Sequence, residues 1–147
     1  MNALRAPLII AMMLIPYILL TLRSFGFLSG LGANPVETII HETGLWGIRF
    51  LMLTLLITPI AYYSGIGSIA KLGKPVGLMA FFYVLNHFLS YALIDQAGDI
   101  GVIIIDIIET PYLIVGWGGF LCLFGVASVS FKRLEEWFSK NRSTISG

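Results

Sequence analysis

Charged residues are scarce in this chain, and cysteine and histidine are scarcer still. Lysine, arginine, aspartate and glutamate together make up 12% of the 147 residues, whereas hydrophobic residues make up 57%. Ordinary soluble domains are about 25% charged and about 45–50% apolar, so this composition excludes a soluble domain and indicates an integral membrane protein. The formal net charge of +1 gives no indication of a nucleic-acid partner. The single cysteine, Cys122, excludes an internal disulfide and is expected to be a small packing residue.

Four apolar segments are long enough to cross a hydrocarbon core of about 30 Å, which takes about 20 helical residues. They cover about residues 7–30, 46–63, 75–94 and 112–131, with glycine-rich turns between the first three. The first segment exceeds the length of a signal-peptide core, which favours an uncleaved span. We therefore expect an all-α transmembrane domain over residues 1–131, forming a four-transmembrane-helix bundle, and a cytoplasmic tail over residues 132–147.

The distribution of charges predicts how the spans are oriented. Seven of the nine basic residues lie in the N-terminus, the second loop and the tail: Arg5, Lys71, Lys74, Lys132, Arg133, Lys140 and Arg142. The first and third loops with their adjoining span ends hold six of the eight acidic residues instead. Lysine and arginine stay on the cytoplasmic side. Both termini are therefore expected in the cytoplasm, which in a bacterium places loops one and three in the periplasm.

The third loop contains a segment, residues 99–109, that is too short to span a bilayer. If it is helical, its acidic side chains project from one arc, as in a short amphipathic helix lying in the outer interface. Its isoleucine content would equally suit a strand, so the residues alone leave both structures open.

His87 is the most informative residue, because it lies inside the third apolar segment. A polar side chain at membrane depth is costly and by default marks a functional site. Tyr83, Asn86, Ser90 and Tyr91 share one helical arc of roughly 140° with it. This polar stripe is therefore expected to face protein, a cofactor or a cavity, while the apolar side faces lipid.

Three roles for His87 are open on the residues alone. It could be a structural residue that bonds to a neighbouring helix. A proton relay would need carboxylates at depth, but every acid lies in a loop or a tail. A heme ligand needs an imidazole on an interior face, an apolar sheath and usually a second axial ligand. His41, just before the second span at the same outer end, is either that second ligand or an interfacial residue that helps to start the span.

Glycines and lysines suggest two further features. Small residues mark close helix contacts in membranes. Gly73 and Gly77 begin the third span, and the fourth span carries a further set of small residues: Gly116, Gly118, Gly119, Cys122, Gly125 and Ser128. These positions predict helix contacts or, alternatively, room for a flat macrocycle such as a porphyrin. Lys71 and Lys74 either supply the orientation signal or anchor an anionic group such as a heme propionate, a flavin phosphate or a lipid head group.

Several blocks of residues keep the order and spacing of a known family from about Gly32 to Ser130. They are GANPV with IHETG (32–36 and 40–44), LLITP (55–59), LNHFLSY (85–91) and PYLIVG (111–116). They resemble the heme-binding membrane subunit of the periplasmic protein-methionine-sulfoxide reductase system, the MsrQ or YedZ family. That family belongs to the ferric-reductase-like transmembrane group.

The resemblance implies a cofactor, a donor and a partner. It implies b-type heme, with His87 at the matching ligand position, in an inner-membrane electron-transfer component rather than a catalytic subunit. Electrons would come from quinol or from a cytoplasmic flavin reductase, which would bring FMN. They would pass to a periplasmic molybdopterin-containing catalytic subunit.

The resemblance also implies that something is missing. Family members have two further spans, and the helix immediately after the fourth span supplies the other heme-ligating histidines. Residues 132–147 contain no histidine, so the chain looks like a family member shortened at its C-terminus. Self-association or a separate chain is then expected to supply the missing spans. The alternative is a heme-free membrane anchor or assembly protein that kept the scaffold.

Overall fold

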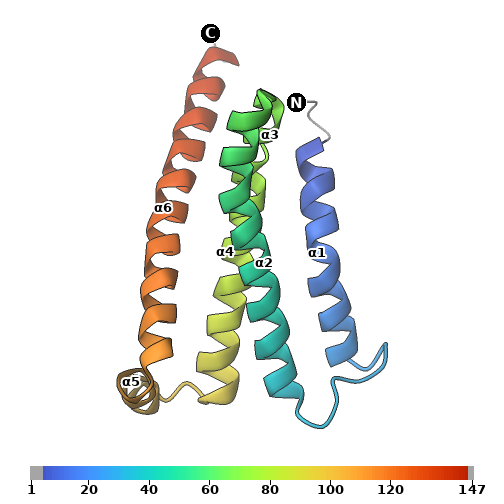
Figure 1. Cartoon of the computed structure of the whole chain (residues 1–147), viewed down its shortest axis with the longest axis vertical. Helices are drawn as coiled ribbons and strands as arrows, with labels where there is room; N and C mark the ends of the chain where they lie inside the picture. Colours follow the sequence, from blue (N-terminus) through green and yellow to red (C-terminus); the bar gives the residue numbers. More distant parts are fainter. Residues whose placement is uncertain (1–4, 146–147) are drawn as a thin grey trace. The chain divides into compact units, whose positions relative to one another are not determined.

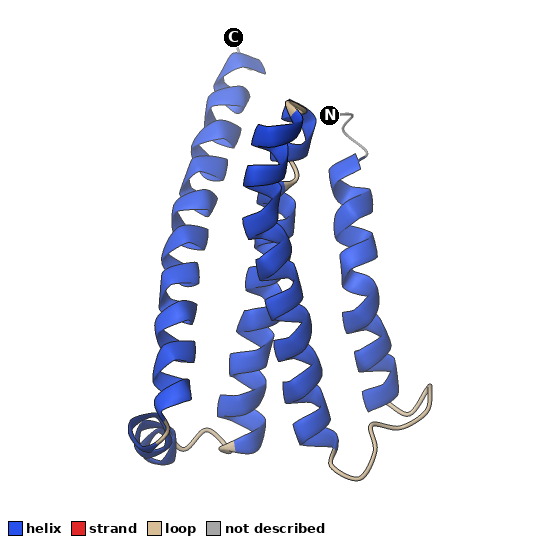
Figure 2. Ribbon diagram, in the orientation of Figure 1, coloured by secondary structure: helices blue, strands red, loops and turns tan. Residues whose placement is uncertain are grey.

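The computed structural model describes the backbone of residues 5–145 and, within it, the side chains of residues 7–125 and 127–129. Every regular element in the described backbone is helical (Figures 1 and 2). The chain divides after residue 105 into two compact units. The first unit contains α1 (Arg5–Ser24), α2 (Pro35–Ser64), α3 (Gly67–Ala70), α4 (Gly73–Leu89) and the π-helical segment η1 (Ser90–Asp95). Helix α5 (Ile100–Glu109) crosses the division, and α6 (Pro111–Ile145) lies in the second unit.

Four helical stretches are long and apolar enough to cross a membrane, which confirms the predicted number of spans. They are Pro7–Ser24, Pro35–Ser64, Gly67–Asp95 and Pro111–Val129. The chain is therefore a multi-pass membrane protein. The fourth helix does not stop near residue 131 but continues to Ile145, so the segment expected as a tail begins as an extension of α6.

Helix α2 begins at Pro35, well before the predicted start near Trp46. The Asn34 side chain accepts a hydrogen bond from the backbone N–H of Glu37 at 3.3 Å, and proline occupies the first helical position. Both are strong helix-start signals. The prediction placed a glycine-rich turn before the second span and therefore put His41 ahead of that span. His41 lies inside α2.

The short segment in the third loop is a helix, α5, so the strand alternative is wrong. Asp99 explains the choice, because its carboxylate accepts hydrogen bonds from the backbone N–H groups of Gly101 and Val102 at 2.9 and 3.2 Å. A carboxylate that caps the first free N–H groups stabilises a helix start. This local bond overrides the strand preference of the isoleucines that follow.

The core of the first unit is the seam between α2 and α4. Ala80 and Val76 on α4 are 0% and 3% exposed, and they pack in one cluster with Phe50 and Ile57 of α2. Gly77 lies so close to α2 that an added Cβ would stand 3.4 Å from Thr54 Cγ2. Lipid is as apolar as these side chains, so such close approach is what holds membrane helices together. The predicted helix contact at Gly77 is present in the structure.

Helix α1 is joined to α4 by the Tyr83 hydroxyl. This group accepts a hydrogen bond from the Tyr17 backbone N–H at 3.0 Å and donates one to the Met13 carbonyl at 2.8 Å. An α-helix would join those two backbone groups to each other directly. The hydroxyl therefore stands within the backbone ladder of α1, beside the helix-breaking Pro16. Tyr83 is 1% exposed, so the junction is fully buried.

Replacing Tyr83 with phenylalanine is expected to loosen α1 without preventing membrane insertion. The variant loses two hydrogen bonds in an apolar interior, and partial reclosure of the α1 ladder limits the cost to about 1–2 kcal/mol. Thermal unfolding in detergent measures this loss. Tyr63→Phe is the matched control, because Tyr63 is 86% exposed. Equal melting temperatures for the two variants would show that the buried junction contributes nothing.

Candidate functional site

His87 lies near the end of α4 and is half-buried against α2. Its Nδ1 atom is 2.8 Å from the carbonyl oxygen of Ile40. The ring also sits directly over Gly44, where an added Cβ would stand 2.8 Å from Nδ1 and 3.0 Å from Cε1. The imidazole is therefore held by a hydrogen bond to the Ile40 carbonyl. It can lie against α2 because Gly44 has no side chain there.

The contact with Ile40 determines which ring nitrogen of His87 carries the proton. A carbonyl oxygen can only accept a hydrogen bond, so Nδ1 must be the donor. In the neutral ring, Nε2 then has no proton and keeps a lone pair. Histidines that ligate metals commonly bond their other nitrogen to a backbone carbonyl in this way, which sets the tautomer and the ring orientation. The described geometry therefore leaves Nε2 of the neutral ring, with its lone pair, as the atom that could bind a metal.

The helical hydrogen-bonding pattern of the backbone changes two residues after His87. Helix α4 ends at Leu89, and the π-helical segment η1 follows, with the Gln96 N–H bonded to the Tyr91 carbonyl five residues earlier at 3.0 Å. Short π-helical segments within helices occur frequently at functional sites. The segment places Ser90 on the wall of a cavity that also includes Asn86.

The polar stripe was predicted to face protein, a cofactor or a cavity, and its residues on α4 face protein. Tyr83 and Asn86 contact α1, where the Tyr17 hydroxyl donates to Asn86 Oδ1 at 3.0 Å. His87 contacts α2 instead. The stripe therefore has contacts with two neighbouring helices, and the histidine is bonded to a backbone carbonyl of α2.

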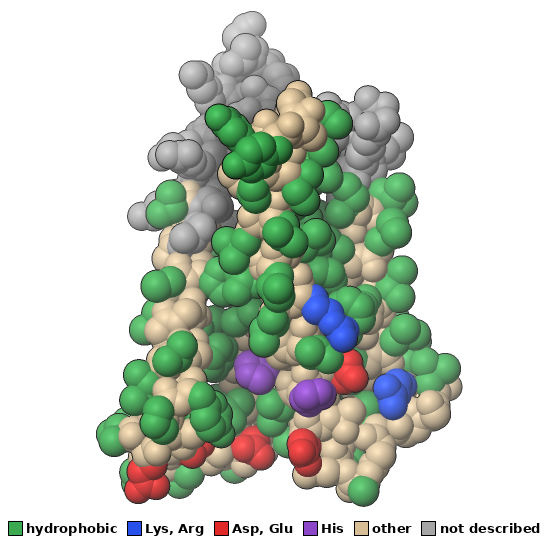
Figure 3. Space-filling view, viewed as in Figure 1, with side chains coloured by type: hydrophobic (Ala, Val, Ile, Leu, Met, Phe, Trp, Pro, Cys, Tyr) green, Lys and Arg blue, Asp and Glu red, His purple; other side chains and the backbone are tan. Residues whose placement is uncertain are grey.

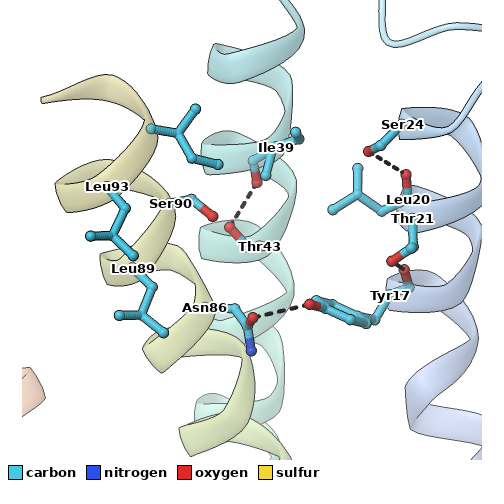
Figure 4. A pocket seen from close by; sticks show the side chains of 11 residues that line it. Tyr17, Leu20, Thr21, Ser24, Ile39, Thr43, Asn86, Leu89, Ser90 and Leu93 are labelled. Atoms are coloured by element: carbon cyan, nitrogen blue, oxygen red, sulfur yellow. Dashed lines mark hydrogen bonds between the residues drawn. The ribbon is translucent and has the colours of Figure 1, made fainter. Parts of the chain in front are cut away.

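A cavity of about 290 Å³ lies between α1, α2 and the junction of α4 with η1 (Figure 4). Six of its lining residues carry a hydroxyl or an amide: Tyr17, Thr21, Ser24, Thr43, Asn86 and Ser90. Three of these hydroxyls donate to carbonyls of their own helices, Thr21 to Tyr17, Ser24 to Leu20 and Thr43 to Ile39. The wall of the cavity is nevertheless mainly apolar, and most of the hydrogen-bonding groups on it are already paired.

His41 lies on α2 one residue after Ile40, and its side chain is exposed. Figure 3 shows both histidine side chains on one face of the first unit. Among the side chains that the structure describes, His41 forms no hydrogen bond with His87. The structure therefore brings His41 to the same end of the bundle as His87 without joining the two.

Lys71 and Lys74 lie at the other end of α4. Lys71 ends α3 and Lys74 is the second residue of α4, and both are exposed. Thirteen residues separate Lys74 from His87, which corresponds to about 20 Å along a helix. The lysines and the histidine therefore form two separate places in the first unit.

The described residues contain no cluster of three or more histidine, cysteine or carboxylate side chains that could hold a metal ion. One half-buried imidazole with an available Nε2 instead fits a single axial position of a heme, whose iron takes its remaining equatorial ligands from the macrocycle. The described residues thus include one half-buried histidine that could hold a heme, and the other histidine, His41, is exposed.

Sequence reasoning found His87 but missed its surroundings. Gly44 and the Ile40 carbonyl fall within a residue block that was identified by resemblance, yet neither was given a role. The missed signal was the glycine four residues after Ile40, since a helix presents a carbonyl and the residue four positions later on one face. Gly47, whose added Cβ would meet Val84 Cγ2 at 2.9 Å, continues the same face.

Comparison with known proteins gives a consistent picture. Proteins of Brucella ovis and Brucella abortus, both named protein-methionine-sulfoxide reductase heme-binding subunit MsrQ, are 45% identical over 86 residues, covering 58% of this chain and 39% of theirs. A protein of the same name from Polaromonas naphthalenivorans is 35% identical over 125 residues, covering 85% of this chain and 56% of its own. No solved structure matches the chain.

The chain spans between 39% and 56% of the length of these curated relatives. A family model described as the ferric reductase like transmembrane component matches residues 43–141, which include both His87 and the start of α6. The matched stretch is more than half of the 147 residues. The family suggested by the residue blocks is thereby confirmed, and this chain belongs to the ferric-reductase-like transmembrane family together with the MsrQ subunits.

Proposed function

We propose that this chain is a heme-binding electron-transfer subunit of a methionine sulfoxide reductase system. The observation that carries the proposal is the His87 imidazole, held at membrane depth with Nδ1 bonded to the Ile40 carbonyl at 2.8 Å. The heme-binding name of relatives 35–45% identical supports it. The absorbance spectrum of the purified protein tests it, because a b-type heme gives bands that the polypeptide lacks.

The residues of this chain would hold the heme, and they would not themselves react. His87 would offer Nε2 as an axial ligand, and the α2 backbone would keep its ring in place. A bound heme would supply one-electron chemistry. His41 is the candidate for the opposite axial position. Lys71 and Lys74 are candidates for an anionic group at the other end of the bundle, such as an FMN phosphate or a lipid head group, because they lie too far along α4 to hold a propionate of a heme at His87.

The proposed donor and acceptor come from the family resemblance. Electrons would enter from quinol or from a cytoplasmic flavin reductase carrying FMN. They would leave to a periplasmic molybdopterin-containing catalytic subunit that reduces methionine sulfoxide. The chain itself would be a component of the oxidoreductase system, and substrate turnover would take place on its partner.

A second function is a heme-free membrane anchor or assembly protein. It is favoured by the exposure of His41, because no other histidine in the chain could complete a pair of axial ligands. The spectrum of the purified protein separates the two functions. Heme bands support the electron-transfer subunit, and a folded protein that lacks them even after heme is added supports the anchor.

We further propose that the protein lies in the bacterial inner membrane with both termini in the cytoplasm. The basis is that seven of the nine basic residues lie in the N-terminus, the second loop and residues 132–147, since lysine and arginine favour the cytoplasmic side. A reporter fused after Gly147 is expected to be active in the cytoplasm, and one inserted near Gly98 is expected to be active in the periplasm. A C-terminal reporter active in the periplasm would contradict this orientation.

A further inference from the structure

Gly44 and Gly47 both face α4 across the same seam, but they meet different neighbours. A Cβ on Gly44 would stand 2.8 Å from His87 Nδ1, whereas a Cβ on Gly47 would stand 2.9 Å from Val84 Cγ2. Real Cβ atoms essentially never come this close to another heavy atom, so a substitution at either position would force a shift. The two glycines are thus equally crowded, and only one of them is crowded by the histidine.

We propose that Gly44 is a positioning residue for His87, and that its missing side chain lets the ring reach the Ile40 carbonyl. Ile40 and Gly44 are four residues apart, so they lie on one face of α2. The carbonyl accepts the Nδ1 proton at 2.8 Å, and the glycine leaves room for the ring to lie over the helix. Together they select the tautomer with a bare Nε2 and fix the direction in which that atom points.

Thr43 reinforces the arrangement. Its hydroxyl donates to the Ile39 carbonyl at 2.7 Å and lies 3.1 Å from the Ile40 carbonyl. The side chain is 1% exposed, so this hydroxyl is buried beside the carbonyl that His87 contacts. An alanine at position 44 would have to push the imidazole itself aside, because the nearest atoms are all atoms of the His87 ring.

The first test examines the histidine without any cofactor. Protein with ¹⁵N-labelled histidine is purified in detergent without added heme and studied by NMR in alkaline buffer. The His87 signals are assigned by their absence from His87→Ala. The expected result is a protonated Nδ1 and an unprotonated Nε2. A proton on Nε2 in the parent chain would overturn the proposal.

The second test compares Gly44→Ala with Gly47→Ala, after circular dichroism has established that each variant keeps its helix content. Gly44→Ala is expected to lose the Nδ1–H signature and to lower heme retention roughly tenfold or more, as loss of a contact that orients a ligand typically does. Gly47→Ala is expected to keep the tautomer and to retain heme nearly as the parent does. Equal effects of the two variants on both readouts would overturn the role of Gly44, because helix separation would then explain them. If Gly44→Ala does not fold, the tautomer of the parent chain remains the deciding measurement.

The heme part of this inference rests on the proposed function, whereas the tautomer part does not. If His87→Ala retains the heme spectrum, His87 is not the ligand and the proposed function loses its site. The NMR result on the heme-free protein still decides whether Gly44 and the Ile40 carbonyl position the ring. The two failures are therefore distinguishable.

Discussion

Replacing His87 with glycine is expected to remove the reduced-minus-oxidised Soret difference of the purified protein. The variant deletes the imidazole whose Nδ1 is bonded to the Ile40 carbonyl, and with it the one half-buried histidine, which is the proposed heme ligand. Glycine within a helix costs only about 1 kcal/mol relative to alanine, so membrane insertion should persist. The space left by the ring allows a decisive control, because free imidazole added to the variant should restore part of the signal.

The spectrum of the parent chain should also report how many axial ligands are present. With His87 alone on one side, the heme is expected to be loosely held and partly high-spin. A stable low-spin spectrum that becomes high-spin in His41→Ala would identify His41 as the second ligand. Heme bands that survive unchanged in His87→Gly, without imidazole, would exclude His87 as a ligand.

Co-expressing this chain with the C-terminal segment of an MsrQ relative is expected to raise its heme content severalfold. The relatives are longer than the stretch they share with this chain, which covers 39% to 56% of them. The resemblance places further heme-ligating histidines in the helix after the fourth span. On α6, Gly118 and Gly125 stand seven residues apart and share one helical face, where the lack of side chains lets a neighbouring helix approach closely. A second axial ligand and a covered face of α6 should both favour retention.

The experiment is co-expression with the C-terminal segment of an MsrQ relative, followed by the heme-to-protein ratio of the purified complex. The matched control is the same segment with its histidines replaced by alanine, which should pack without adding a ligand. Equal heme content with and without the segment would contradict the prediction. Full occupancy in the monomeric chain alone would do the same. Crosslinking through Cys122, which is exposed, reports self-association because one cysteine yields only intermolecular products.

The broad architecture could be predicted because it depends on hydrophobicity along the chain. Each span needs about 20 apolar residues, and segments of that length can be found directly in the sequence. The exact start of α2 could not be read in this way. Asn34 and Pro35 suit a turn and a helix start equally well, and the Glu37 N–H that Asn34 caps becomes relevant only once the helix forms.

The candidate site was predictable only in part, for a similar reason. His87 stands out in the sequence because an ionisable side chain is rare at membrane depth. Its partners do not stand out, because the Ile40 acceptor is a backbone carbonyl and Gly44 contributes by lacking a side chain. The Tyr83 hydroxyl between Met13 and Tyr17 was equally hidden. Such contacts depend on how two helices cross, which the order of residues within either helix does not specify.

Electron passage through the reconstituted protein tests the central claim most directly. Vesicles containing the chain and the complementing segment are reduced with a quinol under anaerobic conditions, and absorbance at the heme bands is followed. The proposed function predicts reduced heme bands that return to the oxidised form when a family catalytic subunit and methionine sulfoxide are both added. They should remain reduced when either is omitted. A folded protein without heme bands, or bands that stay reduced in the presence of both additions, would contradict it.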